Sequence, residues 1–126
     1  MMPSTPLLPA LESYLKLTTA REQAISANMA NVDTPGYHTQ DIDFQGELKK
    51  AMNGVLSQSE DGSVTAQMSP AVQEVQGLME RPDGNNVNLD REGLQMAETQ
   101  LQYQIGVQLV KHQFHQMLSA ISGGSQ

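Results

Sequence analysis

Apolar residues recur at helical spacing near the start of the chain. The pattern predicts a helix from about Pro9 to about Asn31, and proline suits its first turn because the missing N–H would be unpaired there anyway. The steps along one face alternate between four and three residues, which is a heptad rhythm typical of a helix that pairs with another helix. This face, the N-terminal seam, comprises Leu11, Leu15, Thr18, Glu22, Ile25 and Met29.

A second and broader apolar pattern predicts a long helix from about Asn88 to Ile121. Asn88 suits the N-cap, and Asp90 and Glu92 place negative charge in the first turn. The C-terminal seam comprises Met96, Tyr103, Val107, Val110, Phe114, Met117 and Ile121. A second stripe beside it comprises Leu94, Ala97, Leu101, Ile105 and Leu109, of which Leu101 is counted with the seam as a contact residue. This apolar face is wider than a two-helix contact requires and leaves surface for other subunits. Gly123 and Gly124 end the helix.

The middle of the chain lacks helical periodicity. Residues 44–52 are expected to form a short helical or extended arm. A short β-hairpin is expected around the turn signal Asp61-Gly62, with alternating apolar residues at Val64, Ala66 and Met68. The fold predicted is mainly α, with the two long terminal helices paired as a coiled coil and a short irregular or hairpin segment between them. Its regions are residues 1–31, 32–87 and 88–126.

A polar segment separates the first helix from the middle region. The run Thr34-Pro35-Gly36-Tyr37 predicts a type II turn, since proline presets φ at the second position and glycine supplies a positive φ at the third. Asn28 and Asn31 lie on one face of the last helical turns, where their amides can hold loop backbone groups or a neighbouring chain. The same residues also fit an ordinary helix C-terminus followed by a turn.

Composition narrows the function. The formal net charge of -7 argues against nucleic acid as a partner, because phosphate binding needs clustered Lys and Arg. Aromatic residues make up only 4% and there are eight Met, so a large, sharply packed core is not expected. The absence of cysteine excludes disulfides and thiol chemistry. The N-terminus lacks the pattern of a Sec-type signal peptide, and no apolar run approaches the roughly 18 residues of a membrane span. These rules alone predict a soluble cytosolic protein.

Candidate catalytic and metal-binding residues are few. His112 and His115 share a helix face, but no carboxylate follows Glu98 in the sequence, so polar residues flanking an apolar stripe are favoured over a metal site. Asp41 and Asp43 would share a strand face, and a solvated linker or an intersubunit contact is favoured over a catalytic pair. No phosphate-binding loop or nucleophile elbow is present. We therefore expect no enzyme, cofactor or small-molecule substrate.

The polar segment carries a family resemblance. The stretch reads ANMANVDTPGYHTQDIDF and resembles the A-N-x-A-N-x-x-T-P-G-Y signature of bacterial flagellar axial proteins, the rod and hook group. The matching positions are Asn28, Asn31, Thr34, Pro35, Gly36 and Tyr37. The stretches DIDFQGELKKAM and DGNNVNLDREGLQMAETQLQYQIGVQL are similar to the basal-body rod proteins in particular, those of the proximal rod. The resemblance covers both ends of the chain and little of residues 53–82.

The resemblance implies a structural subunit of the proximal rod. Such proteins are exported through the flagellar type III apparatus without signal-peptide cleavage, which replaces the cytosolic prediction. They assemble helically around the export channel, where their terminal helices pair into an inner coiled-coil layer. The implied partners are further copies, other rod proteins and the export gate or base. Two alternatives remain open. One is a soluble helical adaptor or export chaperone that binds a partner through the C-terminal helix. The other is a cell-wall hydrolase, which no motif in the sequence supports.

Overall fold

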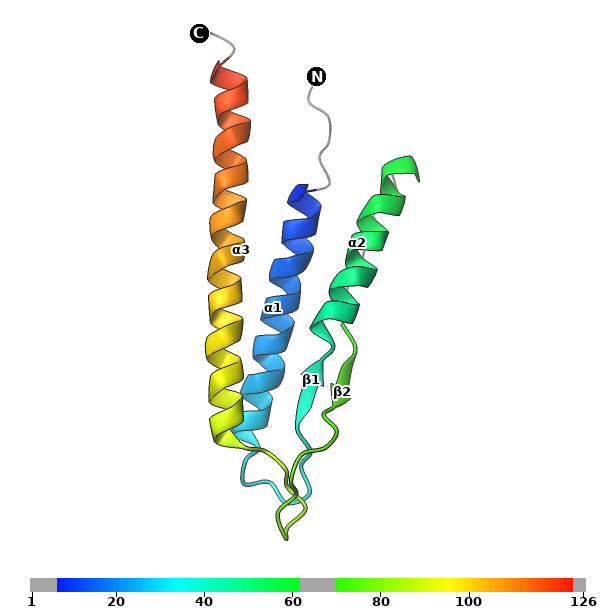
Figure 1. The fold of residues 1–126 in the computed structure, drawn as a ribbon, viewed down its shortest axis with the longest axis vertical. Coiled ribbons are helices and arrows are strands. Elements are labelled where there is room, and N and C mark those ends of the chain that lie inside the picture. The colour runs from blue at the N-terminus through cyan, green and yellow to red at the C-terminus, as the bar shows by residue number, and fades with distance from the viewer. Residues whose placement is uncertain (1–6, 62–69, 124–126) are drawn as a thin grey trace.

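Three helices and two short strands make up the part of the chain that the computed structural model describes, namely residues 7–61 and 70–123, with side chains at 7–55 and 70–122. The elements are α1 (Leu7–Ala30), β1 (Gln40–Ile42), α2 (Phe44–Asp61), β2 (Val72–Glu74) and α3 (Leu89–Gly123). Helix α1 lies between α3 and α2 and runs antiparallel to both (Figure 1). The predicted mainly α fold with paired terminal helices is confirmed.

Helix α1 is covered on two sides, and this explains its burial pattern. Leu11 and Ile25 of the N-terminal seam are buried, as predicted. Leu17 and Ala24 are buried as well, although they lie off the seam. A heptad pattern assumes one partner helix, whereas β1 and α2 contact α1 in addition to α3. The core is therefore a thin layer around α1, which agrees with the expectation from composition.

The line of α3 that α1 covers is displaced from the predicted seam. Thr99 is fully buried and Gly106 is buried, whereas Tyr103, Phe114 and Ile121 expose 41%, 51% and 72% of their surface. The other seam residues are half-buried, namely Met96, Val107, Val110 and Met117. Small residues on the contact line allow two helix backbones to approach closely. The seam assignment followed the largest apolar residues, which lie beside this line rather than on it.

The second stripe of α3 is exposed, as its breadth predicted. Leu94, Leu101, Ile105 and Leu109 are 68%, 56%, 49% and 47% exposed. Helix α3 has 35 residues and α1 has 24, so the C-terminal part of α3 extends past α1 (Figure 1). A single chain therefore leaves much of the apolar surface of α3 in water.

The middle segment differs from the prediction in its detail. The arm is helical and longer than expected, because α2 continues to Asp61. The expected two-stranded β-structure is present, but its strands are β1 and β2, which pair antiparallel across α2 with Asp41 opposite Gln73. The turn proposed at Asp61-Gly62 is wrong for Asp61, since that residue is helical. Val64, Ala66 and Met68 lie outside the described residues.

The starts of α3 and α2 are built as local sequence rules require. Asn88 is the N-cap of α3, because its Oδ1 accepts hydrogen bonds from the backbone N–H groups of Asp90 (3.0 Å) and Arg91 (3.2 Å). Asp43 caps α2 in the same way, accepting from Gly46 N at 3.3 Å. Asp43 thus has a structural role that was not predicted. Gly123 is the last residue of α3, and Gly124 lies outside the described residues.

Candidate functional site

The predicted turn after α1 is present. Tyr37 N donates to Thr34 O at 3.2 Å, and Gly36 has a φ of 76°, which is the positive value that the third position of a type II turn requires. Helix α1 ends at Ala30, and the chain reverses direction within this segment before it enters β1. The sequence therefore predicted both the end of the helix and the geometry of the turn.

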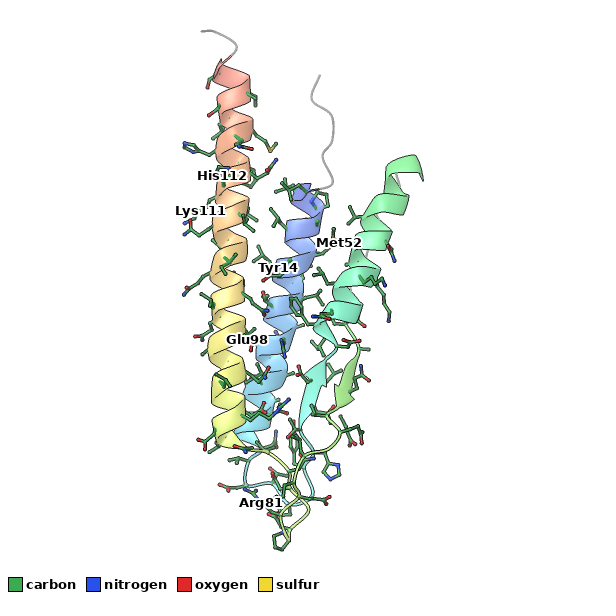
Figure 2. The ribbon with its side chains drawn as sticks, viewed as in Figure 1. Tyr14, Met52, Arg81, Glu98, Lys111 and His112 are labelled. Carbon is green, nitrogen blue, oxygen red and sulfur yellow. The ribbon has the colours of Figure 1, made fainter. Side chains whose placement is uncertain are left out.

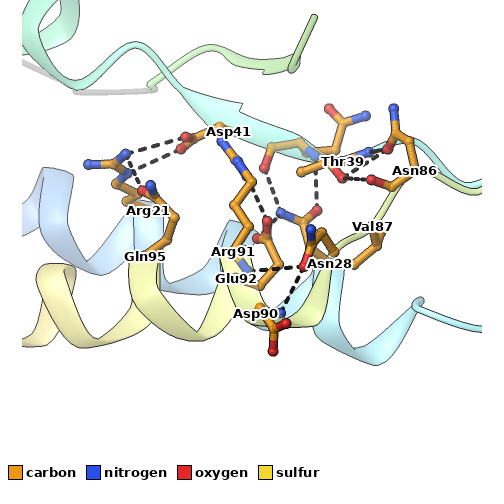
Figure 3. A network of polar contacts seen from close by, with 12 residues as sticks. Arg21, Asn28, Thr39, Asp41, Asn86, Val87, Asp90, Arg91, Glu92 and Gln95 are labelled. Atoms are coloured by element: carbon orange, nitrogen blue, oxygen red, sulfur yellow. Dashed lines mark hydrogen bonds and ion pairs between the residues drawn. The ribbon is translucent and has the colours of Figure 1, made fainter. Parts of the chain in front are cut away.

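The side chain of Asn28 joins three elements at this end of the molecule (Figure 3). Its Nδ2 donates to Gln40 O (2.8 Å) and to Glu92 Oε1 (2.7 Å), and its Oδ1 accepts from Gln40 N (2.9 Å) and Tyr37 OH (3.2 Å). An asparagine amide has two donor hydrogens and two acceptor lone pairs, so all its capacity is used. Asn28 is fully buried, and it pairs with both backbone groups of Gln40 as a neighbouring strand would.

Glu92 is the acidic partner of this amide. The residue is 1% exposed, and its Oε2 accepts from Arg91 Nη1 at 2.7 Å. A buried carboxylate requires both hydrogen bonds and a compensating charge, and Asn28 and Arg91 supply them. The first turn of α3 is thereby fixed to the last turn of α1. We refer to Asn28, Tyr37, Gln40 and Glu92 as the junction.

Two further asparagines hold the turn from the opposite loop. Asn85 Nδ2 donates to Asn31 O (2.9 Å) and Thr34 O (2.8 Å). Asn86 Oδ1 accepts from Thr39 N (2.6 Å) and Thr39 Oγ1 (2.9 Å). Asn85 is fully buried and Asn86 is 9% exposed. The loop before α3 thus replaces water as the partner of the backbone groups that follow α1.

The side chain of Arg21 also links α1 to β1 and α3. Arg21 Nε lies 3.2 Å from Asp41 Oδ1, and Arg21 Nη2 donates to Gln95 Oε1 at 2.6 Å. The Arg21 guanidinium also lies 6.0 Å from the centre of the Phe44 ring. The interpretation of Asp41 as a solvated linker residue is therefore wrong, because it pairs within the chain and its side chain is only 18% exposed. A role of Asp41 in an intersubunit contact stays a prediction.

The structure sorts the sequence candidates into two places. The motif residues gather at the junction and its turn, where Asn28 and Tyr37 bond each other and Thr34 Oγ1 donates to Asn31 Oδ1 at 3.0 Å. Pro35 and Gly36 form the exposed tip of that turn. The C-terminal seam lies elsewhere, along α3. Sequence reasoning missed Thr39, Asn85, Asn86 and Glu92, although the last three fall in the run DGNNVNLDRE that contributed to the resemblance.

The remaining candidate chemistry finds no support in the described residues. His112 and His115 are exposed, and Lys111 and His112 lie on the side of α3 that faces away from α1 (Figure 2). Residues 7–61 and 70–123 contain no group of three or more His, Cys, Asp or Glu side chains placed to hold a metal. None of the helices within these ranges is long and apolar enough to cross a membrane.

Comparison with known proteins decides the family. No family model matches the chain. The flagellar basal body rod protein FlgB of Salmonella typhimurium is 38% identical over 128 residues, which cover 90% of this chain and 91% of the relative. FlgB of Escherichia coli is 36% identical over 126 residues and FlgB of Yersinia ruckeri 34% over 125, each with the same coverage. The chain belongs to the FlgB family of flagellar basal body rod proteins. It is therefore a structural protein of the flagellar rod, and the resemblance read from the sequence is confirmed.

Family membership gives the junction a context. In this FlgB-family chain the axial-protein motif supplies the end of α1, the turn and one side of a buried polar network. The other side comes from the loop before α3 and from the first turn of that helix. Residues far apart in the sequence thus fix the angle at which α1, β1 and α3 meet.

Alkaline unfolding tests the role of Tyr37 in the junction. Burial, together with the nearby Glu92 carboxylate, raises the pKa of Tyr37 above its ordinary value of 10.0. The folded chain holds this proton more tightly than the unfolded chain does, so the contribution is fully present below pH 10.0 and is lost as the pH rises through the folded pKa. We expect Tyr37→Phe to reduce the loss of unfolding free energy as the pH rises above 10.0, measured by urea titration.

Tyr14 allows a comparison, since burial also raises its pKa. Tyr14→Phe should remove a separate share of the alkaline loss, and the double variant should lose both. An unchanged pH dependence in Tyr37→Phe would show that the phenol is solvated in the folded chain.

Proposed function

We propose that this rod protein is a subunit of the proximal rod that assembles helically around the export channel. Its partners would be further copies of itself, other rod proteins, and the export gate or base, which it would link to the rest of the rod. Support comes from the similarity to FlgB proteins along 90% of the chain and from the pairing of α1 with α3 into an elongated unit.

The observation that carries the proposal is the apolar surface of α3. One side exposes Leu94, Leu101, Ile105 and Leu109, and another exposes Tyr103, Phe114, Leu118 and Ile121. Monomeric proteins rarely leave contiguous apolar surface of this extent in water. Two such sides on one helix suit a subunit that has neighbours on both sides. We assign the C-terminal seam to contacts between subunits, with Val107, Val110 and Met117 also contributing to the contact with α1.

The motif would then set the direction of the chain. The junction ends α1 and sends β1 and α2 back along α1 on the side opposite α3, and it holds this arrangement through buried amides rather than through a large core. Delivery by the flagellar export route, without a cleaved signal peptide and to the periplasmic side, follows from the same proposal.

Replacement of one exposed apolar residue tests this function. A host that lacks its own copy of the gene should regain motility with the parent chain, and the tagged protein should co-purify with basal bodies. We expect Phe114→Asp to abolish incorporation and motility, because burial of an unpaired carboxylate costs several kcal/mol. Secretion should be retained, and it should depend on the export gate.

The adjacent variant His115→Asp is the matched control, since it introduces the same carboxylate at an exposed polar position. It should be incorporated and motile. Absence of the parent chain from basal bodies, together with a defined dimer bound to another exported protein, would instead identify an adaptor or export chaperone.

A further inference from the structure

In the part of the chain that the structure describes, a groove runs along α1 between residues contributed by α3 and β2. It consists of two adjoining hollows of ≈ 350 and ≈ 440 Å³, which share Ala20, Gln23 and Pro70. Residues of α1 from Glu12 to Ala27 form the floor. Tyr103 of α3 lines one hollow and Val72 of β2 lines the other. We call this feature the α1 groove.

The groove is almost free of charge. Among the described residues that line it, only Glu12 and Lys16 at one end carry charge, and their side chains pair with each other at 3.3 Å. The described residues 20–72 that line the other hollow include no carboxylate and no basic side chain. A charged occupant would lose its hydration here without gaining a partner, so the groove favours an uncharged one. The small side chains of Ala20, Ala24 and Ala27 leave room for close approach.

The exposed stripe of α3 has the matching properties. No Asp, Glu, Lys or Arg occurs between Glu98 and Lys111. Leu101, Ile105 and Leu109 repeat at every fourth position and span about 12 Å at 1.5 Å per residue. The α1 floor from Thr19 to Ala27 has the same length. The stripe therefore presents a row of large apolar side chains to a groove floored by small ones.

We propose that the α3 stripe of one copy lies in the α1 groove of the next copy. This inference rests on the proposed function and specifies which two surfaces join like subunits. The stripe lies on the side of α3 away from α1, whereas the groove lies on α1 itself, so each copy can use both surfaces at once. An interface between two different surfaces is heterologous and continues as an open helical assembly when its rotation does not close.

The relative direction of the two helices in this contact follows from the repeat of the assembly. Copies related by such a repeat keep their long axes in one direction, so the α3 of the neighbour runs antiparallel to this α1, as the chain's own α3 does. With Ile105 beside Ala20, His112 of the neighbour lies near Glu12, since the two residues are seven and eight positions further along their helices. In this register Leu101 lies beside Ala24 and Ile105 beside Ala20, in the uncharged part of the groove, and Leu109 lies beside Lys16, whose charge is paired with Glu12.

Cysteine cross-linking tests the interface directly, because the native chain contains no cysteine. Two differently tagged full-length variants, Ala20→Cys and Ile105→Cys, are expressed together in a host that lacks the native gene, and isolated basal bodies are oxidised. We expect a disulfide-linked heterodimer carrying both tags. A second pair, Gln23→Cys with Leu101→Cys, covers the same contact about one turn away. The control pair Ser26→Cys with Ile105→Cys should yield about tenfold less product, because Ser26 does not line the groove and the effective concentration of its thiol is low.

The outcomes separate this inference from the proposed function. Incorporation of both variants with no heterodimer from either groove pair would overturn the inference and leave the rod assignment intact. A predominant Ile105→Cys homodimer would show that the stripes pair with each other in an isologous contact. Heterodimers with a different rod protein in place of a second copy would overturn the choice of occupant. Absence of the parent chain from basal bodies would overturn both proposals.

Discussion

Replacing Asn28 with aspartate should destabilise the chain by at least about 3 kcal/mol, because it places a second carboxylate against a buried one. The change removes the amide that donates to Glu92 Oε1 at 2.7 Å and to Gln40 O at 2.8 Å. Arg91 is the one cation bonded to this carboxylate in the described part of the chain and would have to compensate two negative charges. Total stabilities are commonly about 5–15 kcal/mol, so a large share would be lost. Urea unfolding near neutral pH measures the change.

Acid should partly rescue this variant. Protonation of either carboxylate removes the repulsion, so the deficit relative to the parent chain should shrink as the pH is lowered. Asn31→Asp is the matched control, three residues away. The Asn31 side chain donates one hydrogen bond, to Ala27 O at 2.8 Å, and is only half-buried, so about 1 kcal/mol is expected. Equal effects at the two positions would mean that the junction does not depend on its buried amide.

The sequence predicted what depends on local rules. The ends of α1 and α3, the N-cap at Asn88 and the type II turn at Pro35-Gly36 follow from the periodicity of apolar residues and from the φ preferences of proline and glycine. Each feature involves residues within a few positions of one another. For the same reason, an apolar stripe on α3 broader than one partner requires could be recognised from spacing alone.

The sequence could not give features that depend on which distant residues meet. Asn28 and Glu92 are 64 positions apart, and the local sequence around either residue does not indicate that the other is its partner. Leu17 could not be placed in the core from a heptad, because its burial requires contacts that α1 makes outside the seam. The pairing of β1 with β2 across α2 was missed because three-residue strands carry almost no periodic signal. The turn of the candidate site is therefore formed by residues that are close in the sequence, whereas its hydrogen-bond network joins residues that are far apart in the sequence.

Gly106 shows why the contact line of α3 differs from its most apolar face. A Cβ atom at this position would lie 2.7 Å from Leu15 Cδ2 and 3.1 Å from Tyr14 Cδ2. The Tyr14 ring is held by an edge-on contact with Phe44, with 5.5 Å between ring centroids, so it has little freedom to move. The two long helices can approach this closely because position 106 lacks a side chain. A larger apolar residue there would separate them.

We therefore expect Gly106→Val to destabilise the chain by about 1–3 kcal/mol, the usual cost of overpacking a well-fitted contact. Glycine is itself a poor helix former, so its replacement by alanine brings an opposing gain of up to about 1 kcal/mol in helix propensity. Gly106→Ala should accordingly be milder than Gly106→Val, since rotation of the Leu15 side chain can relieve the closest contact of the new Cβ, and only its approach to Tyr14 at 3.1 Å opposes the gain in helix propensity. Valine adds two further carbons to this crowded position, and the gain in helix propensity no longer offsets the clash.

Gly93→Val provides the control on the same helix. A Cβ built at Gly93 has no heavy atom within 4 Å, so this variant should be as stable as the parent chain or slightly more stable. Thermal and urea unfolding of the three variants measure the order, which we expect to be Gly93→Val, Gly106→Ala and then Gly106→Val, from most to least stable. If Gly106→Val were as stable as Gly93→Val, the two helices would not be in close contact at this level, and the displaced contact line would have to be abandoned.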